Sequence, residues 1–275
     1  MTHPFIAIIG VGHMGESLLS GLIASGHPRD KIYACDVHEE RLTRIRTEWG
    51  VLTGKDNHEA ISRASIVLFA VKPQQLKEVI FSSKAAILTA KPLVISIAAG
   101  VRESSIRSWL DNQIAIVRAM PNMPALIQTG ITALYATPQV SQAERNLAES
   151  VLRTVGVTVW MTDEATMDAV TAISGSGPAY FFYVMEALQQ AGIAMGLPEK
   201  TARLLTIQTA FGAAKMVLES DESLKVLREK VTSKGGTTEE AIRVFEAAEL
   251  QTIFTEAVKA ATTRSKELAI LLEGD

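Results

Sequence analysis

Short, continuous apolar runs recur along the first 162 residues and alternate with segments of helical periodicity. The runs are rich in β-branched residues and are bounded by glycine, proline or polar residues, which is typical of buried strands. The pattern predicts strands over 5–9, 31–35, 65–71, 93–97, 114–118, 131–136 and 158–161, and helices over 13–25, 38–48, 57–63, 74–84, 102–110 and 141–154. Such alternation indicates βαβ units, so we predict an α/β domain whose mainly parallel, doubly wound sheet carries helices on both faces.

The pattern changes after about residue 163, where the β-rich runs end and helical periodicity continues to the C-terminus. The predicted helices span 165–173, 178–195, 198–219, 222–231, 238–247 and 250–272. Several are apolar on more than one face, and a helix of that kind must be buried on all sides. A helical domain this small offers little interior, so we predict that residues 163–275 form an all-helical dimerisation domain that packs against a second copy.

A glycine-rich turn, G-V-G-H-M-G, follows the first predicted strand and opens the first predicted helix. Gly10 allows the tight turn, Gly12 lets a pyrophosphate approach the backbone, and Gly15 permits close packing of helix and strand. Asp36 ends the second strand, where an acid accepts hydrogen bonds from ribose hydroxyls. Residues 1–162 are therefore predicted to be a Rossmann-type dinucleotide-binding domain. Its first cofactor contacts are Gly10, Val11, Gly12, His13, Met14, Gly15 and Asp36.

Further cofactor candidates lie where other predicted strands end, and such loops share one crevice in a doubly wound sheet. The backbone of Ala70, Val71, Lys72 and Pro73 is expected to face phosphate or ribose, with Lys72 either adding charge or simply solvated. The small residues Ala98 and Ala99 permit close approach of a ring. Two asparagines keep two interpretations each: Asn57 contacts the cofactor or caps a helix, and Asn122 binds a carboxamide or orders a turn.

Composition narrows the possible functions. A net charge of −3 without any basic block argues against nucleic-acid binding, and no apolar stretch is long enough for a membrane span. The chain starts its first strand almost at once, without the features of a secretory signal. Its single cysteine, Cys35, fits a reducing compartment and is expected in the core. We therefore predict a cytoplasmic protein.

Histidines occur only in the first 58 residues, so the helical half lacks a histidine acid–base partner. The single cysteine and the lack of His/Cys clusters argue against a metal site. A hydride acceptor bound here must therefore need little proton transfer from the protein. An imine fits, because its nitrogen can arrive already protonated.

Two glycine-rich joints stand in the helical half, S-G-S-G-P at 174–178 and T-S-K-G-G-T-T-E at 232–239. Each precedes a predicted helix and offers backbone N–H groups and hydroxyls, which can bind a small anion such as a carboxylate. In the second joint Thr237 or Thr238 can equally serve as a helix N-cap.

Residues 231–241, V-T-S-K-G-G-T-T-E-E-A, resemble the signature of the pyrroline-5-carboxylate reductase family. Motifs in the family's order and spacing lie at 10–15, 70–73, 96–100, 120–124, 174–180 and 212–216, so the resemblance covers essentially the whole chain. It implies reduction of 1-pyrroline-5-carboxylate to L-proline with hydride from NADPH or NADH. It also implies a helical domain interleaved between two subunits, often within a ring of dimers.

The resemblance also implies roles for individual residues. Thr237 and Thr238 hold the substrate carboxylate through backbone N–H groups, the Thr238 hydroxyl bonds the ring nitrogen, and Glu164 is a substrate-side carboxylate. We therefore predict Thr238 as the catalytic residue and substrate contacts from Glu164, Ser176, Ser233, Gly236, Thr237 and Thr238. Asn57, residues 70–73, Ala98 and Ala99 match the family's cofactor wall.

Two residues depart from the family pattern. Lys234 stands where most members have proline, and Asp36 stands where NADPH-preferring members often carry a small hydroxyl residue. A carboxylate there repels a 2′-phosphate, although His38, Arg41 or Arg44 can offset this repulsion. The preference between NADPH and NADH therefore stays open.

Two alternative functions remain at this point. A β-hydroxyacid dehydrogenase shares the glycine-rich start but needs a lysine soon after its substrate loop, and the first lysine after Gly177 is Lys200. A nucleotide-sensing dimer without catalysis leaves the 232–240 loop unexplained.

Overall fold

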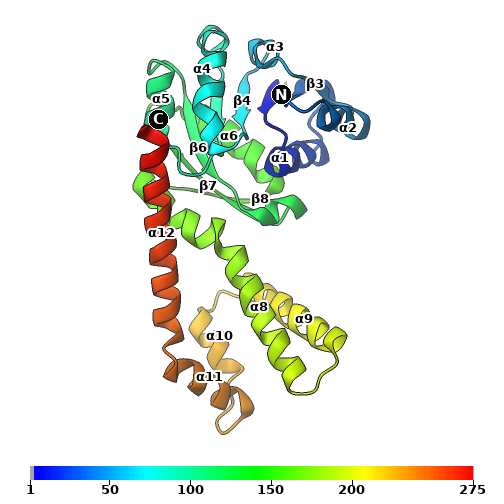
Figure 1. Cartoon of the computed structure of the whole chain (residues 1–275), viewed down its shortest axis with the longest axis vertical. Helices are drawn as coiled ribbons and strands as arrows, with labels where there is room; N and C mark the ends of the chain where they lie inside the picture. The colour runs from blue at the N-terminus through cyan, green and yellow to red at the C-terminus, as the bar shows by residue number, and fades with distance from the viewer. Residues whose placement is uncertain (1–2, 275) are drawn as a thin grey trace. The chain divides into compact units, whose positions relative to one another are not determined.

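The computed structural model describes residues 3–274, which form two compact units (Figure 1). The first unit runs to Ser176 and includes the chain again from Ala261, and the second is Gly177–Ala260. The last turns of the chain belong to the first unit because Ser265 and Ala269 are buried there. The functional division at residues 162 and 163 stays a prediction, and its ends at residues 1, 2 and 275 lie outside the described residues.

The first unit is built on one eight-stranded sheet in the order β3-β2-β1-β4-β5-β6-β7-β8. All neighbouring strands are parallel except β6 and β7, which are antiparallel. The strands are β1 Ile6–Ile9, β2 Ile32–Cys35, β3 Leu52–Gly54, β4 Ile66–Phe69, β5 Leu93–Ser96, β6 Ile116–Met120, β7 Gly130–Ala136 and β8 Gly156–Trp160. The central strands β1, β4 and β5 are buried on both faces, which explains their continuous apolar runs.

Helices cover both faces of this sheet (Figure 1). One apolar cluster joins the sheet to α1, α2 and α6, and the other joins it to α3, α4 and α5. The helices are α1 His13–Ala24, α2 Glu39–Trp49, α3 Asn57–Ser62, α4 Pro73–Ala90, α5 Glu103–Trp109 and α6 Gln142–Leu152. The predicted α/β fold class with a doubly wound sheet is confirmed.

Strand β3 was not predicted from the sequence. It has three residues, none of them buried, and pairs in parallel with β2 through Tyr33, Ala34 and Cys35. A strand this short carries too little apolar periodicity to be recognised. It extends the parallel sheet beyond β2 and forms one of its edges.

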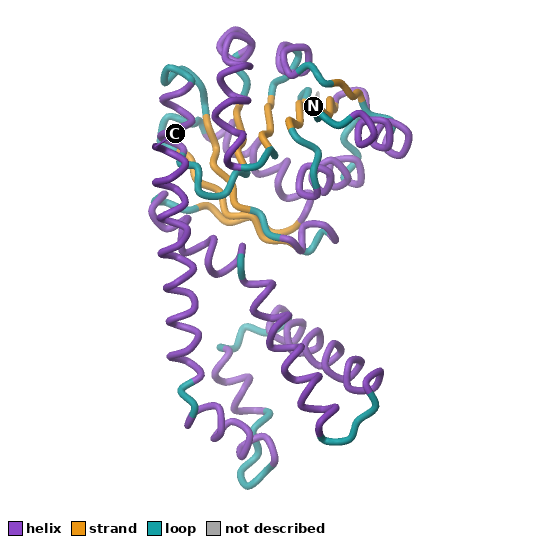
Figure 2. Tube along the Cα trace, viewed as in Figure 1, coloured by secondary structure: helices purple, strands orange, loops and turns teal. Residues whose placement is uncertain are grey.

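The second unit contains helices and connecting turns (Figure 2). Its helices are α8 Gly177–Ala194, α9 Glu199–Leu218, α10 Leu224–Lys230, α11 Thr237–Ala247 and the first part of α12 Leu250–Gly274. Within residues 177–260, all of which are described, the buried residues are Gly177, Ala202 and Thr206. Its many large apolar side chains are therefore exposed in the single chain. No helix in residues 3–274 is long and apolar enough to cross a membrane.

The chain between the sheet and the second unit differs from the continuous helix expected over 165–173. It forms a 3-10 turn, Glu164–Thr166, then α7 Met167–Val170, then a π-helical turn, Thr171–Gly175. The Ser176 N–H donates to the carbonyl of Thr171, five residues earlier, at 2.9 Å. The glycine-rich joint at 174–178 therefore consists of the end of this π-helical turn and a bend at Ser176, and α8 follows it from Gly177.

Candidate active site

The three motif glycines between β1 and α1 meet different surroundings. Gly10 has φ +90°, and a Cβ there would lie 2.9 Å from the carbonyl oxygen of Ala70. A Cβ on Gly15 would lie 2.2 Å from the carbonyl oxygen of Gly10. A Cβ on Gly12, by contrast, would meet no protein atom within 4 Å. Packing therefore requires glycine at 10 and 15, whereas the space beside Gly12 can admit a ligand.

Gly12 is also the N-cap of α1, and no side chain caps this helix end. The first N–H groups of a helix point along its axis and favour an anion. An open glycine and an uncapped helix start are the features that a pyrophosphate group needs, so Gly10, Val11, Gly12, His13, Met14 and Gly15 fit a dinucleotide here.

Asp36 directly follows β2, and both of its carboxylate oxygens accept hydrogen bonds. Oδ2 accepts hydrogen bonds from the Val11 N–H at 3.0 Å and from Arg41 Nη1 at 2.8 Å. Oδ1 accepts from the His38 N–H at 3.0 Å, and His38 Nδ1 lies 2.7 Å from it. Burial raises the pKa of Asp36, but the hydrogen bonds from His38, Arg41 and Val11 outweigh burial and lower this pKa to about 2. The carboxylate is therefore fully charged at neutral pH.

The two nearby arginines differ in their engagement. Arg41 binds Asp36, while Arg44 forms two hydrogen bonds with Glu16, at 2.5 and 2.6 Å. The Glu16 hydrogen bonds raise the pKa of Arg44. Arg44 thus pairs with the carboxylate of Glu16, whereas Arg41 pairs with that of Asp36.

The other predicted cofactor residues follow the carboxyl ends of neighbouring parallel strands. Ala70, Val71 and Lys72 connect β4 to α4, where Pro73 takes the first helical position and Lys72 is exposed. Ala98 and Ala99 follow β5, and the Ala98 N–H donates to the buried Ser96 hydroxyl at 3.4 Å. Their cofactor contacts stay predictions, but the topology places these loops along one edge of the sheet.

The two asparagines have different outcomes. Asn57 is the first residue of α3 and does not cap it, because Asp56 is the N-cap and accepts from the His58 N–H at 2.8 Å. Asn122 orders its turn, since its Oδ1 accepts from the Ile131 N–H at 3.0 Å. The capping interpretation of Asn57 is therefore wrong, and the turn interpretation of Asn122 is confirmed. A cofactor contact from either side chain stays a prediction.

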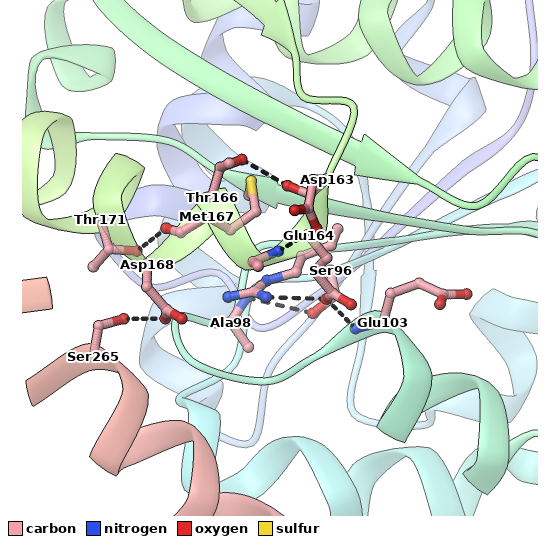
Figure 3. Close-up of polar contacts among 12 residues, drawn as sticks. Ser96, Ala98, Glu103, Asp163, Glu164, Thr166, Met167, Asp168, Thr171 and Ser265 are labelled. Carbon is pink, nitrogen blue, oxygen red and sulfur yellow. Dashed lines mark hydrogen bonds and ion pairs between the residues drawn. The ribbon is translucent and has the colours of Figure 1, made fainter. Parts of the chain in front are cut away.

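Glu164 lies in a polar cluster on the first unit (Figure 3). Its Oε1 accepts hydrogen bonds from the Glu103 N–H at 2.6 Å and from Arg118 Nη1 at 3.0 Å. Asp163 caps the Glu164–Thr166 turn by accepting from the Ala165 N–H at 2.9 Å. Sequence reasoning missed Arg118, although a lone arginine in an apolar strand is itself a signal for a buried ion pair.

A second buried polar contact in this unit joins α7 to the C-terminal half of α12 (Figure 3). The Ser265 hydroxyl donates to Asp168 Oδ1 at 2.7 Å, and both residues are buried. No local sequence pattern could reveal this hydrogen bond, because the two residues are 97 positions apart. The bond helps to hold the segment that leads to Ser176.

The second glycine-rich joint forms the start of α11 in the second unit. Gly236 is the N-cap of this helix and no side chain caps it, so neither Thr237 nor Thr238 is the N-cap. Glu239 Oε2 instead accepts from the Gly235 N–H at 2.6 Å, and Gly235 has φ +72°. The capping alternative for the two threonines is wrong. The first N–H groups of α11, including those of Thr237 and Thr238, are left for another acceptor.

The predicted substrate residues fall on both units. Glu164 and Ser176 belong to the first unit, and Ser233, Gly236, Thr237 and Thr238 belong to the second. Lys234 is exposed in the same loop. The substrate roles of these residues stay predictions.

Two family models match the chain. Residues 5–100 match the model described as NADP oxidoreductase coenzyme F420-dependent, and residues 164–268 match the one described as pyrroline-5-carboxylate reductase dimerisation. The matched ranges fall on the β1–β5 part of the sheet and on most of the helical C-terminal region.

Relatives resemble the chain over nearly its whole length. A pyrroline-5-carboxylate reductase of Pseudomonas aeruginosa is 45% identical over 269 residues, covering 98% of each chain. The solved structure of a pyrroline-5-carboxylate reductase from Coxiella burnetii is 43% identical with a TM-score of 0.94, covering 98% of this chain and 99% of that one. A Plasmodium falciparum pyrroline carboxylate reductase solved with NADP bound is 26% identical with a TM-score of 0.86, at 98% and 99% coverage.

Proposed function

The chain belongs to the pyrroline-5-carboxylate reductase family, and we propose that it reduces 1-pyrroline-5-carboxylate to L-proline with hydride from NADPH or NADH. The observation that carries this proposal is the 45% identity to a reductase over 98% of both chains. Membership confirms the resemblance of residues 231–241 and the predicted class, an NAD(P)-dependent oxidoreductase. It also decides against the β-hydroxyacid dehydrogenase alternative.

The residues of the first unit fit a nicotinamide dinucleotide. The open side of Gly12 and the uncapped start of α1 suit the pyrophosphate, and Asp36 suits a ribose. When bound, the reduced nucleotide supplies a hydride to the carbon of the C=N bond. The loops after β4, β5 and β6 are proposed to orient the nicotinamide.

The start of α11 is proposed to hold the substrate carboxylate. The N–H groups of Thr237 and Thr238 stand in the first turn of a helix without a side-chain cap, where a carboxylate is favoured. The protonated ring nitrogen donates a hydrogen bond to the Thr238 hydroxyl. Hydride addition then turns the planar cation into a neutral amine, which takes a proton from water. Positioning and electrostatics supply most of the rate enhancement, and the protein need not transfer a proton.

Isotope transfer tests this reaction. With nicotinamide nucleotide carrying deuterium at the transferred position, the protein should convert the imine to proline that is one mass unit heavier, as read by mass spectrometry. Proline of unchanged mass, or no proline, contradicts the proposed hydride transfer.

Asp36 is proposed to set the cofactor preference, and its replacement should shift it. A charged carboxylate next to a ribose 2′-phosphate costs binding energy, so Asp36→Ser should raise the ratio of kcat/KM for NADPH to that for NADH by roughly 10- to 100-fold. The change also releases Arg41 to meet a phosphate. Steady-state kinetics with both nucleotides measure this ratio. Asp30→Ser, at an exposed turn, is the matched control, and an unchanged ratio in Asp36→Ser would refute the role of Asp36.

The helical second unit is proposed to form a homodimer. Its match to a dimerisation model agrees with apolar side chains left uncovered in one chain, such as Leu204 at 66% and Phe211 at 62% exposure on α9. Covering such side chains gains about 1.5–3 kcal/mol each, which favours a second copy as the partner. A ring of dimers and a cytoplasmic location are further parts of the proposal; the location rests on the single cysteine.

Introducing a charge on α9 should break this dimer. Phe211→Glu places a carboxylate in the proposed apolar interface, so sedimentation should show a chain of 29.7 kDa in place of a dimer or larger assembly. Phe81→Glu, at an exposed aromatic residue of α4 in the first unit, is the control and should keep the wild-type mass. Equal masses for Phe211→Glu and the wild type would argue against α9 as the interface.

A further inference from the structure

Arg118 is a buried arginine in the middle of the sheet. It lies on β6, paired with Ser96 of β5 on one side and with Tyr135 of β7 on the other, and is 4% exposed. A buried guanidinium is strongly unfavourable unless a carboxylate compensates it. Its place in an otherwise apolar strand therefore needs a reason.

That reason is Glu164, which accepts two hydrogen bonds on the same carboxylate oxygen. Arg118 Nη1 and the Glu103 N–H both donate to the same oxygen, Oε1, at 3.0 and 2.6 Å. Two donors from different elements, β6 and the start of α5, fix the position and rotation of the carboxylate. The second oxygen, Oε2, takes part in neither bond, and the side chain keeps 18% exposure.

The surroundings of Glu164 are otherwise unfavourable for a negative charge. Glu103 is buried on α5, and burial first, then the nearby Glu164, raises its pKa, against the opposing effect of Arg107 at 3.3 Å. Burial raises the pKa of Tyr135, and Glu164, Glu103 and Asp163 raise it further. Arg118 thus contacts Glu164 directly within a cluster of carboxylates.

We propose that Arg118 is a positioning residue for the reduction, acting through Glu164, whose Oε1 it holds so that Oε2 can meet the cationic imine substrate. The proposal rests on the proposed function, in which Glu164 is the substrate-side carboxylate. A carboxylate held in place attracts a protonated ring nitrogen more strongly than a mobile one. Arg118 therefore acts on the affinity for the imine and leaves the affinity for the nucleotide unchanged.

A double-mutant cycle tests whether Arg118 acts through Glu164. Arg118→Met and Glu164→Gln should each raise KM for the imine roughly tenfold, and the double variant should be no worse than Glu164→Gln alone. KM for the nucleotide should stay at the wild-type value in all three. Arg118→Lys, which keeps the positive charge, should recover part of the loss.

Stability measurements separate positioning from a purely structural role. Arg118→Met leaves Glu164 unpaired and should lower Tm, whereas the double variant leaves no unpaired charge and should recover part of that loss. Arg145→Met is the matched control. Arg145 bonds the carbonyls of Ala136 and Thr137 at 3.0 and 2.8 Å, so its loss should lower Tm with no change in KM for the imine.

An unchanged KM for the imine in Arg118→Met, or a further rise when Arg118→Met is added to Glu164→Gln, would overturn the proposal. If Arg118→Met does not fold, Arg118→Lys and the comparison of the double variant with Glu164→Gln decide in the same way. Failure of the proposed function would give a different result, because the wild-type protein itself would then not turn over the imine.

Discussion

Thr238→Ala is expected to lower kcat/KM for the imine roughly 100-fold while leaving the fold intact. Its hydroxyl is proposed to accept the hydrogen bond of the protonated ring nitrogen, and a bond to a charged group of this kind is strong. Thr238 does not cap α11, because Gly236 is the N-cap and no side chain caps the helix. The free energy of unfolding should therefore change by about 0.5 kcal/mol or less.

Steady-state kinetics and thermal unfolding on the same preparation measure both quantities. Thr238→Ser keeps the hydroxyl and should keep most of the activity. Thr255→Ala removes a threonine hydroxyl from exposed α12, where it donates to the carbonyl of Gln251, and is the matched control. Wild-type kinetics in Thr238→Ala would remove this residue from the mechanism.

Gly12→Ala is expected to weaken nucleotide binding roughly 100-fold without unfolding the protein. A Cβ at this position meets no protein atom within 4 Å, and the backbone has φ −69°, which alanine adopts without strain. Loss of a good N-cap lowers stability, whereas the smaller entropy of the unfolded chain raises it. The free energy of unfolding should therefore change by about 1 kcal/mol or less. The methyl group instead occupies the space proposed for the pyrophosphate, which must lie against the backbone N–H groups.

Gly15→Ala provides the contrast. Its Cβ would lie 2.2 Å from the carbonyl oxygen of Gly10, so the protein without nucleotide should be destabilised by about 1–3 kcal/mol. Titration of the nucleotide by calorimetry and unfolding of the nucleotide-free protein distinguish the two variants. Normal affinity in Gly12→Ala would mean that the pyrophosphate does not lie against this turn.

The fold of the first unit was predictable because the central strands of its sheet are buried on both faces. Strands such as β1 and β4 appear as unbroken apolar runs, and the glycine motif marks the first turn without ambiguity. Helix ends were less certain: α4 extends to Ala90, well beyond the expected residue 84, because its later turns bury Ile87. The unpredicted β3 has no buried residue to reveal it.

The candidate site was harder to predict where the backbone conformation determines which groups are available. The S-G-S-G-P sequence was predicted to be a joint with free backbone N–H groups, yet Thr171–Gly175 forms a π-helical turn. Gly175 packs against Met120 in this turn, and a Cβ on Gly175 would lie 2.6 Å from the Met120 Cε. Thr237 and Thr238 both qualify as caps by residue type, and the choice of Gly236 follows from the turn at Gly235. Residue type alone does not determine which of several polar residues a chain uses as its cap.

Long-range polar contacts were beyond sequence reasoning. The hydrogen bond from Arg118 to Glu164 spans 46 residues, and the one from Ser265 to Asp168 spans 97. No local pattern links such partners, although a buried arginine in a strand signals that a carboxylate must lie nearby. The residue assigned here to positioning therefore emerged from the structure.

We infer above all that this chain is a working imine reductase. The most direct measurement follows the absorbance of NADH and of NADPH with the purified protein, with and without 1-pyrroline-5-carboxylate. We predict loss of absorbance that depends on the imine, with proline as the product. A folded protein that binds nucleotide but oxidises neither one with the imine present would contradict the claim and favour a nucleotide-sensing dimer.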